Sequence, residues 1–293
     1  MSDQYQIRLY DRLMAGRWNI SPSNECKFEA KYEWEAFAES FYEELRGTAC
    51  IVADNVAEFC EQFQEGTRLN QIDMPNLIPP WPSFFVEWRV LDAKQLAYGY
   101  KWAGALCVSH EDQGRSAVTI LPMVANPSTS TVMITPPTAF SYSEHGEITG
   151  WRFPDNSEGF DTTILPPIMA MVFANCQNTR VVDWLSPSPA LAKSFERRNE
   201  RKLSPFKWIE ITPMTRLISE RIESEGKGAD RGAIAFHEVR AHIGKYGPKF
   251  GKGKLFGKHE GTYLFSSHSR GSKDSRQRVA GYRLNLHGKS SAA

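Results

Sequence analysis

The spacing of hydrophobic positions predicts two helices near the start of the chain. Phe37, Phe41 and Leu45 recur every four residues, so they form one apolar stripe on a helix. A second stripe follows after Gly47, with glutamates on the outward side of both. The pattern therefore predicts an antiparallel αα-hairpin between residues 28 and 65 with an acidic outer face. The second stripe consists of Val52, Val56, Phe59 and Phe63.

The middle of the chain alternates between short apolar runs and turn residues. These runs are rich in Val, Ile and Thr, and Gly, Pro, Asn and Ser separate them, which is typical of a mostly antiparallel sheet. The first strand is expected to begin near Phe84, after a proline-rich approach. The other strands are expected at residues 104–109, 117–124 and 131–135.

Residues 165–174 are apolar on all sides, which predicts a helix in the core with Pro166 and Pro167 in its first turn. A basic, helix-like run follows at residues 193–202, between prolines. Residues 206–211 then read as another strand.

Strand alternation in residues 232–293 predicts a small antiparallel sheet of three strands with one apolar and one polar face. Val239 and Tyr263 belong to the apolar sets of the first two strands, and residues 280–286 supply the third. His237 falls on the same side as Val239, so a structural role is expected for it. The polar face is expected to gather Glu238, Arg240, His242, His268, Arg270 and Arg283.

Charge also divides the chain into two parts, with the division near residue 191. The net charge is only +1, but residues 191–293 hold 22 of the 35 lysines and arginines and 10 of the 34 acidic residues. We therefore predict an α+β fold with the αα-hairpin and antiparallel sheet in an acidic domain and a small antiparallel β module at the C-terminus. The predicted parts are an acidic domain at 1–185, a Pro-bounded basic connector at 186–231 and a basic β module at 232–293. Such a separation indicates that the basic part meets a polyanion.

Several classes of protein are excluded by what the sequence lacks. The first residues contain no apolar segment of the secretory type, and the longest apolar run, 164–174, is far shorter than the roughly 20 residues that span a membrane. An intracellular, cytoplasmic protein without a membrane partner is expected. The five cysteines form no C-x-x-C pair, and on a regular strand His237 and His242 point to opposite faces. No metal and no cofactor is expected.

The C-terminal module carries the residues expected to bind nucleic acid. Four lysines on the glycine-rich link at 247–258 favour phosphate contacts that tolerate any base sequence. Interleaved aromatic residues, Tyr246, Phe250, Phe256 and Tyr263, suit base stacking. The predicted nucleic-acid-binding residues are Arg240, His242, Lys245, Lys252, Lys254, Lys258, His268, Arg270 and Arg283.

The same polar face supports a second chemistry. A carboxylate and two imidazoles could act as general base and general acid on the 2′-hydroxyl of RNA, with an arginine stabilising the phosphorane charge. The candidate catalytic residues of such a metal-independent endoribonuclease are Glu238, His242 and His268. Whether the chain is an enzyme stays open at this stage.

Four segments carry a resemblance to a known group. They are P-x-FF-x-EW at residues 82–88, H-x-x-R-x-H at 237–242, LFGK-x-x-G-T-Y at 255–263 and H-x-R-G at 268–271. With these segments the chain resembles a group of uncharacterised proteins encoded by phages and prophage-like elements. The resemblance implies an α+β fold and a mobile-element setting, and it implies no reaction.

The sequence therefore favours a phage-type accessory protein that binds nucleic acid, or another polyanion, through the C-terminal face. A protein–protein effector or inhibitor of host machinery fits the same charge separation, because an acidic part can occupy a host's nucleic-acid site. The expected partner is accordingly a nucleic acid or a host protein.

Overall fold

The chain divides into two compact units, Met1–Thr212 with Ile243–Leu264, and Pro213–His242 with Phe265–Ala293. None of the described helices is long and apolar enough to cross a membrane. The computed structural model describes residues 7–26, 31–60, 77–112, 114–152, 161–211, 237–239, 242–248, 253–255, 257–265 and 268–270.

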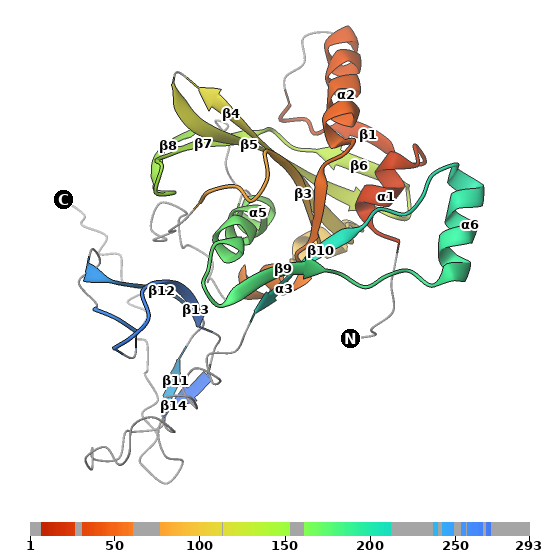
Figure 1. Cartoon of the computed structure of the whole chain (residues 1–293). Helices are drawn as coiled ribbons and strands as arrows, with labels where there is room; N and C mark the ends of the chain where they lie inside the picture. Colours follow the sequence, from red (N-terminus) through yellow and green to blue (C-terminus); the bar gives the residue numbers. More distant parts are fainter. Residues whose placement is uncertain are drawn as a thin grey trace, which may run out of the picture. The chain divides into compact units, whose positions relative to one another are not determined.

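One mixed sheet forms the centre of the first unit. Within the described residues it has ten strands in the order β1-β6-β5-β4-β3-β2-β10-β9, and β7 and β8 continue from β5 (Figure 1). Strands β3 to β6 pair antiparallel, as predicted, and so do β7 and β8, which were not predicted. Strand β2 is parallel to both β3 and β10, and β1 is parallel to β6. The strands are β1 (Asn19–Pro22), β2 (Ala49–Val52), β3 (Ser83–Arg89), β4 (Trp102–Asp112), β5 (Arg115–Asn126), β6 (Thr131–Ile134), β7 (Thr138–Tyr142), β8 (Ile148–Arg152), β9 (Thr179–Asp183) and β10 (Phe206–Ile211).

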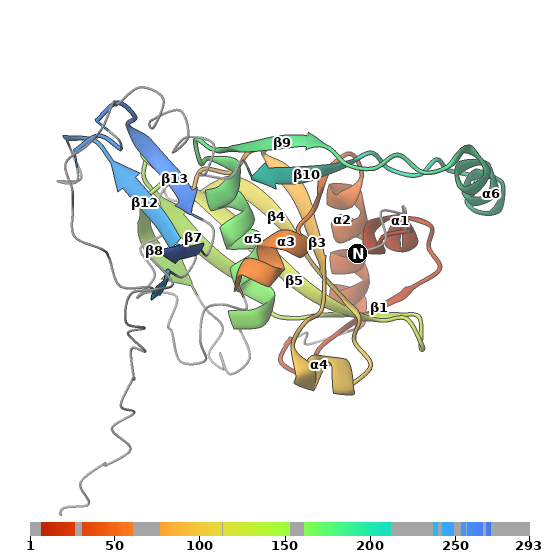
Figure 2. The same ribbon diagram turned by 90° about the horizontal axis from the view of Figure 1, so that it is seen from below.

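Helices cover both faces of this sheet (Figure 2). Leu9 of α1 and Phe41 of α2 pack in one buried cluster with Phe85 of β3. On the other face α3 and α5 pack together, where the rings of Phe59 and Phe173 lie 4.9 Å apart, and α5 contacts β4 and β5. The helices are α1 (Leu9–Met14), α2 (Lys31–Leu45), α3 (Asp54–Cys60), α4 (Ala93–Ala97), α5 (Asp161–Ala174) and α6 (Pro189–Asn199).

Both helices of the predicted αα-hairpin are present, but the hairpin itself is wrong, because a strand lies between them. The first helix is present as α2, but residues 49–52 form β2, and α3 begins only at Asp54. Strand β2 lies between β3 and β10, and Cys50, Ile51 and Val52 are buried. A strand buried on both faces reads as a continuous apolar run, which periodicity cannot distinguish from a buried helix.

The core helix α5 is confirmed, but its start is not. It begins at Asp161, so Pro166 and Pro167 lie inside the helix rather than in its first turn. Met169 and Phe173 are fully buried, in agreement with the apolar pattern. A proline in a helix interior costs about 3 kcal/mol, and the burial of this helix on all sides offsets that cost.

Part of the predicted connector is an integral part of the first unit. The basic helix is present as α6, capped by Ser188, whose Oγ accepts a hydrogen bond from the Leu191 N–H at 3.3 Å. The predicted strand is β10, which pairs with β2 and β9. The boundaries at 185 and 231 stay predictions, because residues 212–231 lie outside the described residues.

The C-terminal part contributes two short ladders. In one, β12 pairs with β13, and in the other, β11 pairs antiparallel with β14. The first predicted strand thus pairs with the second, in two segments. The third predicted strand, at 280–286, lies outside the described residues. The four strands are β11 (His237–Val239), β12 (His242–Tyr246), β13 (Gly261–Phe265) and β14 (His268–Arg270).

Strand β13 is tied to the segment that follows α5. The Leu264 N–H donates to Asn178 Oδ1 at 2.8 Å, and Asn178 Nδ2 donates to the Leu264 carbonyl at 2.8 Å. The Gln177 N–H donates to the Thr262 carbonyl at 2.8 Å. A Cβ at Gly261 would lie 2.9 Å from Gln177 Cγ, so a glycine there permits the close approach. The buried side-chain amide of Asn178 therefore pairs with β13 as the backbone of a neighbouring strand would.

We expect the substitution Asn178→Ala to destabilise the protein, because it leaves the buried N–H and carbonyl of Leu264 without partners. The free energy of unfolding in urea should fall by about 1–3 kcal/mol, and amide exchange at Leu264 should accelerate. Asn199→Ala is the matched control, since the Asn199 side chain donates, among the described residues, to Phe195 of its own helix. Unchanged protection of Leu264 in the Asn178→Ala variant would contradict this assignment.

Candidate functional site

Three of the predicted site residues, Arg240, Lys252 and Arg283, lie outside the described residues. Five others lie in β11, β12 and β14, namely Glu238, His242, Lys245, His268 and Arg270. In the β11–β14 ladder, Glu238 is paired with Ser269, and Val239 with His268. Paired positions of an antiparallel ladder share a face.

The ladder register differs from the grouping expected from the sequence. His268 and Arg270 pair with Val239 and His237, so their positions lie on the face opposite to that of Glu238. The sequence analysis had placed Glu238, His268 and Arg270 on one face. A pairing register is set by backbone hydrogen bonds, and a shift of one residue exchanges the faces of a strand. The chemical roles of these residues stay predictions.

The described lysines of the hairpin β12–β13 are partly compensated. The Nζ atom of Lys254 lies 3.0 Å from Oε1 of Glu260, so this cation already has an anionic partner, whereas Lys258 is exposed. Tyr263 was expected to stack on bases, but it is buried, and its ring lies 6.2 Å from that of Tyr246. Tyr263 therefore packs in the interior of the first unit.

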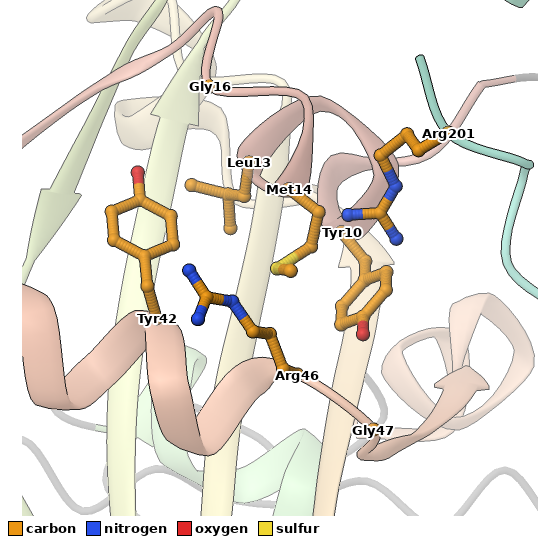
Figure 3. Close-up of a pocket in the computed structure, with 8 residues that line it drawn as sticks. All are labelled: Tyr10, Leu13, Met14, Gly16, Tyr42, Arg46, Gly47 and Arg201. Atoms are coloured by element: carbon orange, nitrogen blue, oxygen red, sulfur yellow. The ribbon is translucent and has the colours of Figure 1, made fainter. Parts of the chain in front are cut away.

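A pocket of about 530 Å³ lies elsewhere, on the face of the first unit that α1 and α2 cover. Its volume is within the range of small-ligand pockets. Figure 3 shows two arginines and two tyrosines around Met14, with the guanidinium group of Arg46 directed toward Tyr42 and that of Arg201 beside Tyr10. The pocket is lined by Tyr10, Leu13, Met14, Gly16, Tyr42, Arg46, Gly47 and Arg201.

Helix α1 is fixed by buried charges at its first turn. Arg8 is 1% exposed, and its Nη2 donates to Oδ2 of Asp54 at 3.0 Å. Its Nε lies 3.2 Å from Oε1 of Glu87, which makes an ion pair, although neither atom has a hydrogen-bond partner within the described residues. The guanidinium carbon lies 4.7 Å from the ring centre of Trp184 and 5.4 Å from that of Trp102. Arg8 thus joins the start of α1 to the sheet.

Glu87 also caps the helix, because its Oε2 accepts a hydrogen bond from the Tyr10 N–H at 2.9 Å. Complete burial raises the pKa of this carboxyl to about 7, and Arg8 opposes the rise only in part. The side chain that orients the pocket-forming helix therefore takes up or loses its proton near neutral pH.

Tyr10 joins the two helices of the pocket. Its hydroxyl donates to the Leu45 carbonyl at the end of α2, at 2.8 Å. Burial raises the pKa of both Tyr10 and Tyr42, so both phenols stay neutral at physiological pH and add no negative charge to the pocket. Gly47, with φ of 81°, turns the chain away immediately after Arg46.

The two arginines of the pocket have no ion-pair partner within the described part of the chain. Arg46 is exposed, and Nε of Arg201 is buried without a hydrogen-bond partner there. A second nitrogen of Arg201 donates to Ser204 Oγ at 3.4 Å, and the Ser204 N–H donates to the buried Asp11 at 2.9 Å. The segment that carries Arg201 is therefore held against α1, while part of its guanidinium group stays available.

Opposite charges flank the pocket. Both ribbon views show α1 between α2 and α6 (Figures 1 and 2). Nη2 of Arg17 donates to the Arg198 carbonyl at 2.8 Å, which ties the segment after α1 to α6. Helix α2 exposes glutamates and α6 exposes cations. The exposed charged residues are Glu35, Glu39, Glu43 and Glu44 on α2, and Lys193, Arg197 and Arg198 on α6, which also exposes Glu196.

No pattern in the sequence indicates this pocket. Arg201 lies in a basic run, and Tyr10, Tyr42 and Arg46 belong to no motif. These residues come from three segments, the outermost of which, at Tyr10 and Arg201, are 191 positions apart, and no local spacing signals that they line one pocket. The described residues contain no group of three or more His, Cys, Asp or Glu side chains that could hold a metal ion.

Comparisons with known proteins give a distant likeness to a solved structure. No protein-family model matches the chain, and no curated protein matches it. Among solved structures, the crystal structure of AcrVA2 is similar with a TM-score of 0.31 and 13% sequence identity, over 82% of this chain and 78% of that chain. A likeness this weak carries no conclusion about what the chain binds.

Glu87→Gln tests the buried cluster through pH. Because the native carboxyl has a pKa of about 7 instead of 4.5, the folded state holds a proton between these values that the unfolded state releases. This carboxyl therefore makes the free energy of unfolding fall as pH rises through the window, on the order of 2 kcal/mol between pH 5 and 8. Glutamine has no such proton, so urea titrations of the variant should show a shallower fall.

The exposed Glu43 gives the matched control, since Glu43→Gln should keep the wild-type slope. Equal slopes for wild type and Glu87→Gln would show that Glu87 is ionised throughout this window.

Proposed function

We propose that this chain is a binding protein that acts by occupying a partner protein of the host, through the face formed by α1, α2 and α6. The observation that carries this proposal is the pocket with two arginines that lack ion-pair partners within the described residues, between an acidic and a basic helix. The resemblance stated from the sequence supplies the host setting.

The types of residue in the pocket support a protein partner. Tyrosine, arginine and methionine are the side chains that protein interfaces concentrate, because each combines a large contact area with polar or adaptable ends. Tyr10, Tyr42, Met14, Arg46 and Arg201 supply all three types within one cavity.

The mixed charge of the face supports the same choice over nucleic acid. A nucleic acid carries a phosphate at every step, so it gains at the cations of α6 and is repelled by the glutamates of α2. A protein surface can present both signs, and complementary charges then set its orientation. In the described part of the C-terminal hairpin, the Lys254–Glu260 pair and the buried Tyr263 add no support for nucleic-acid binding.

The proposal is tested with a tagged chain in bacterial lysate treated with nuclease, where the captured proteins are quantified and the main one is then purified for calorimetry. We expect the charge reversal Glu39→Arg/Glu43→Arg to weaken its binding about tenfold or more at low salt, because the acidic side of the face is lost.

The matched control is Lys254→Ala/Lys258→Ala, in the C-terminal hairpin, which should leave that affinity unchanged. Capture that disappears with nuclease, or that depends on these lysines and not on Glu39 and Glu43, overturns the proposal in favour of nucleic-acid binding.

A further inference from the structure

We propose that the pocket holds a carboxylate of the partner, from an acidic residue that stands beside an apolar one, with Arg46 and Arg201 on either side of this ligand. This inference rests on the proposed function and deepens it, because it gives the partner a chemical signature. It follows from the contents of the pocket.

Arg201 offers donors to a ligand in the cavity. Its Nε is buried without a hydrogen-bond partner within the described residues, and its Nη2 donates to Ser204 Oγ at 3.4 Å, so the protein satisfies this guanidinium group only in part. Arg201 also lines the cavity, and a ligand oxygen beside its guanidinium group gains a charge-assisted hydrogen bond. A guanidinium group offers parallel N–H donors that match the two oxygens of a carboxylate.

The electrostatic surroundings favour a singly charged group. The buried Asp11 is held close to Arg201 through Ser204, and helix α2, which Arg46 follows directly, exposes four glutamates. These anions lower the positive potential of the cavity, so one negative charge balances the two arginines better than a doubly charged phosphate. The neutral phenols of Tyr10 and Tyr42 leave that balance unchanged.

The apolar part of the lining calls for an apolar neighbour. Leu13 is fully buried beneath the cavity and belongs to the main core, and Met14 packs against that core. Figure 3 shows Met14 between the two arginines, so a ligand that reaches both of them passes over its thioether. Leucine, methionine or an aromatic side chain next to the carboxylate would fill this space, and methionine adapts to several shapes.

The pocket is built before the ligand arrives. The hydrogen bond from the Tyr10 hydroxyl to the Leu45 carbonyl joins α1 and α2, and Leu13 and Leu45 are fully buried between them. Binding therefore orders mainly the two arginine side chains, which limits the loss of conformational entropy.

The inference is tested by NMR on the full chain, following the Nε–Hε signals of arginine during titration with blocked dipeptides. Acetyl-leucyl-glutamate amide should shift the signals of Arg46 and Arg201 and bind with a Kd on the order of millimolar, as expected for so small a ligand. The neutral acetyl-leucyl-glutamine amide, acetyl-glycyl-glutamate amide and inorganic phosphate should each bind at least about fivefold more weakly, since each lacks one of the required features.

Arg46→Gln and Arg201→Lys should each weaken the leucyl-glutamate probe about tenfold or more, because each removes a charge-assisted hydrogen bond. Arg197→Gln, on the exposed side of α6, is the matched control and should leave its affinity unchanged. Backbone spectra of the three variants verify that they are folded.

Equal binding of the glutamine probe, tighter binding of phosphate, or unchanged affinity in both pocket variants overturns the inference. The two proposals fail separately. If the probe does not bind while Glu39→Arg/Glu43→Arg still loses the partner protein, only the carboxylate pocket is wrong. If the probe binds and no partner protein depends on the face, the proposed function is wrong.

Discussion

The burial of Arg8 is the constraint on which the arrangement of the first unit depends. A guanidinium group that is 1% exposed must be compensated, because an unpaired charge in a protein interior is strongly destabilising. Glu87, Asp54 and two tryptophan rings supply that compensation from β3, α3, β4 and the segment after β9. Since Tyr10, Leu13 and Met14 follow on the same helix, the geometry of the pocket is set by a charge that the pocket itself does not contain.

The sequence was most informative where a single element carries its own signal. The core helix around Met169, the strand from Ser83 and the helix before Arg201 were predicted from apolar runs, β-branched residues and proline boundaries. The strand β2 was missed because Val52 fits the helical stripe of Val56 and Phe59 as well as a buried strand. What decides between a helix and a strand here is the pairing of β2 with β3 and β10, which lie about 30 and about 160 residues away in the chain.

The candidate site was harder to predict for a related reason. The densest local cluster of histidines and arginines lies in the C-terminal part, whereas Arg46 and Arg201 line one pocket only through the packing of α1 between α2 and α6 (Figure 1). The register of β11 and β14 is likewise a property of the pair, and no alternation within either strand reveals it. The charge separation along the sequence has a counterpart in space, since glutamates of α2 and cations of α6 flank the same cavity.

The discontinuity of the first unit has a consequence for how the protein is made. The chain leaves this unit after Thr212 and returns at Ile243, and the last contacts of Asn178 are with Leu264. On a ribosome, the sheet up to β10 can assemble while the C-terminal part is still being synthesised. The side-chain amide of Asn178 can form its two hydrogen bonds to Leu264 only after residue 264 has emerged. Translation that stops between residues 212 and 264 therefore releases a nearly complete unit in which Asn178 lacks both hydrogen bonds to Leu264, and incomplete units of this kind are recognised by chaperones and proteases.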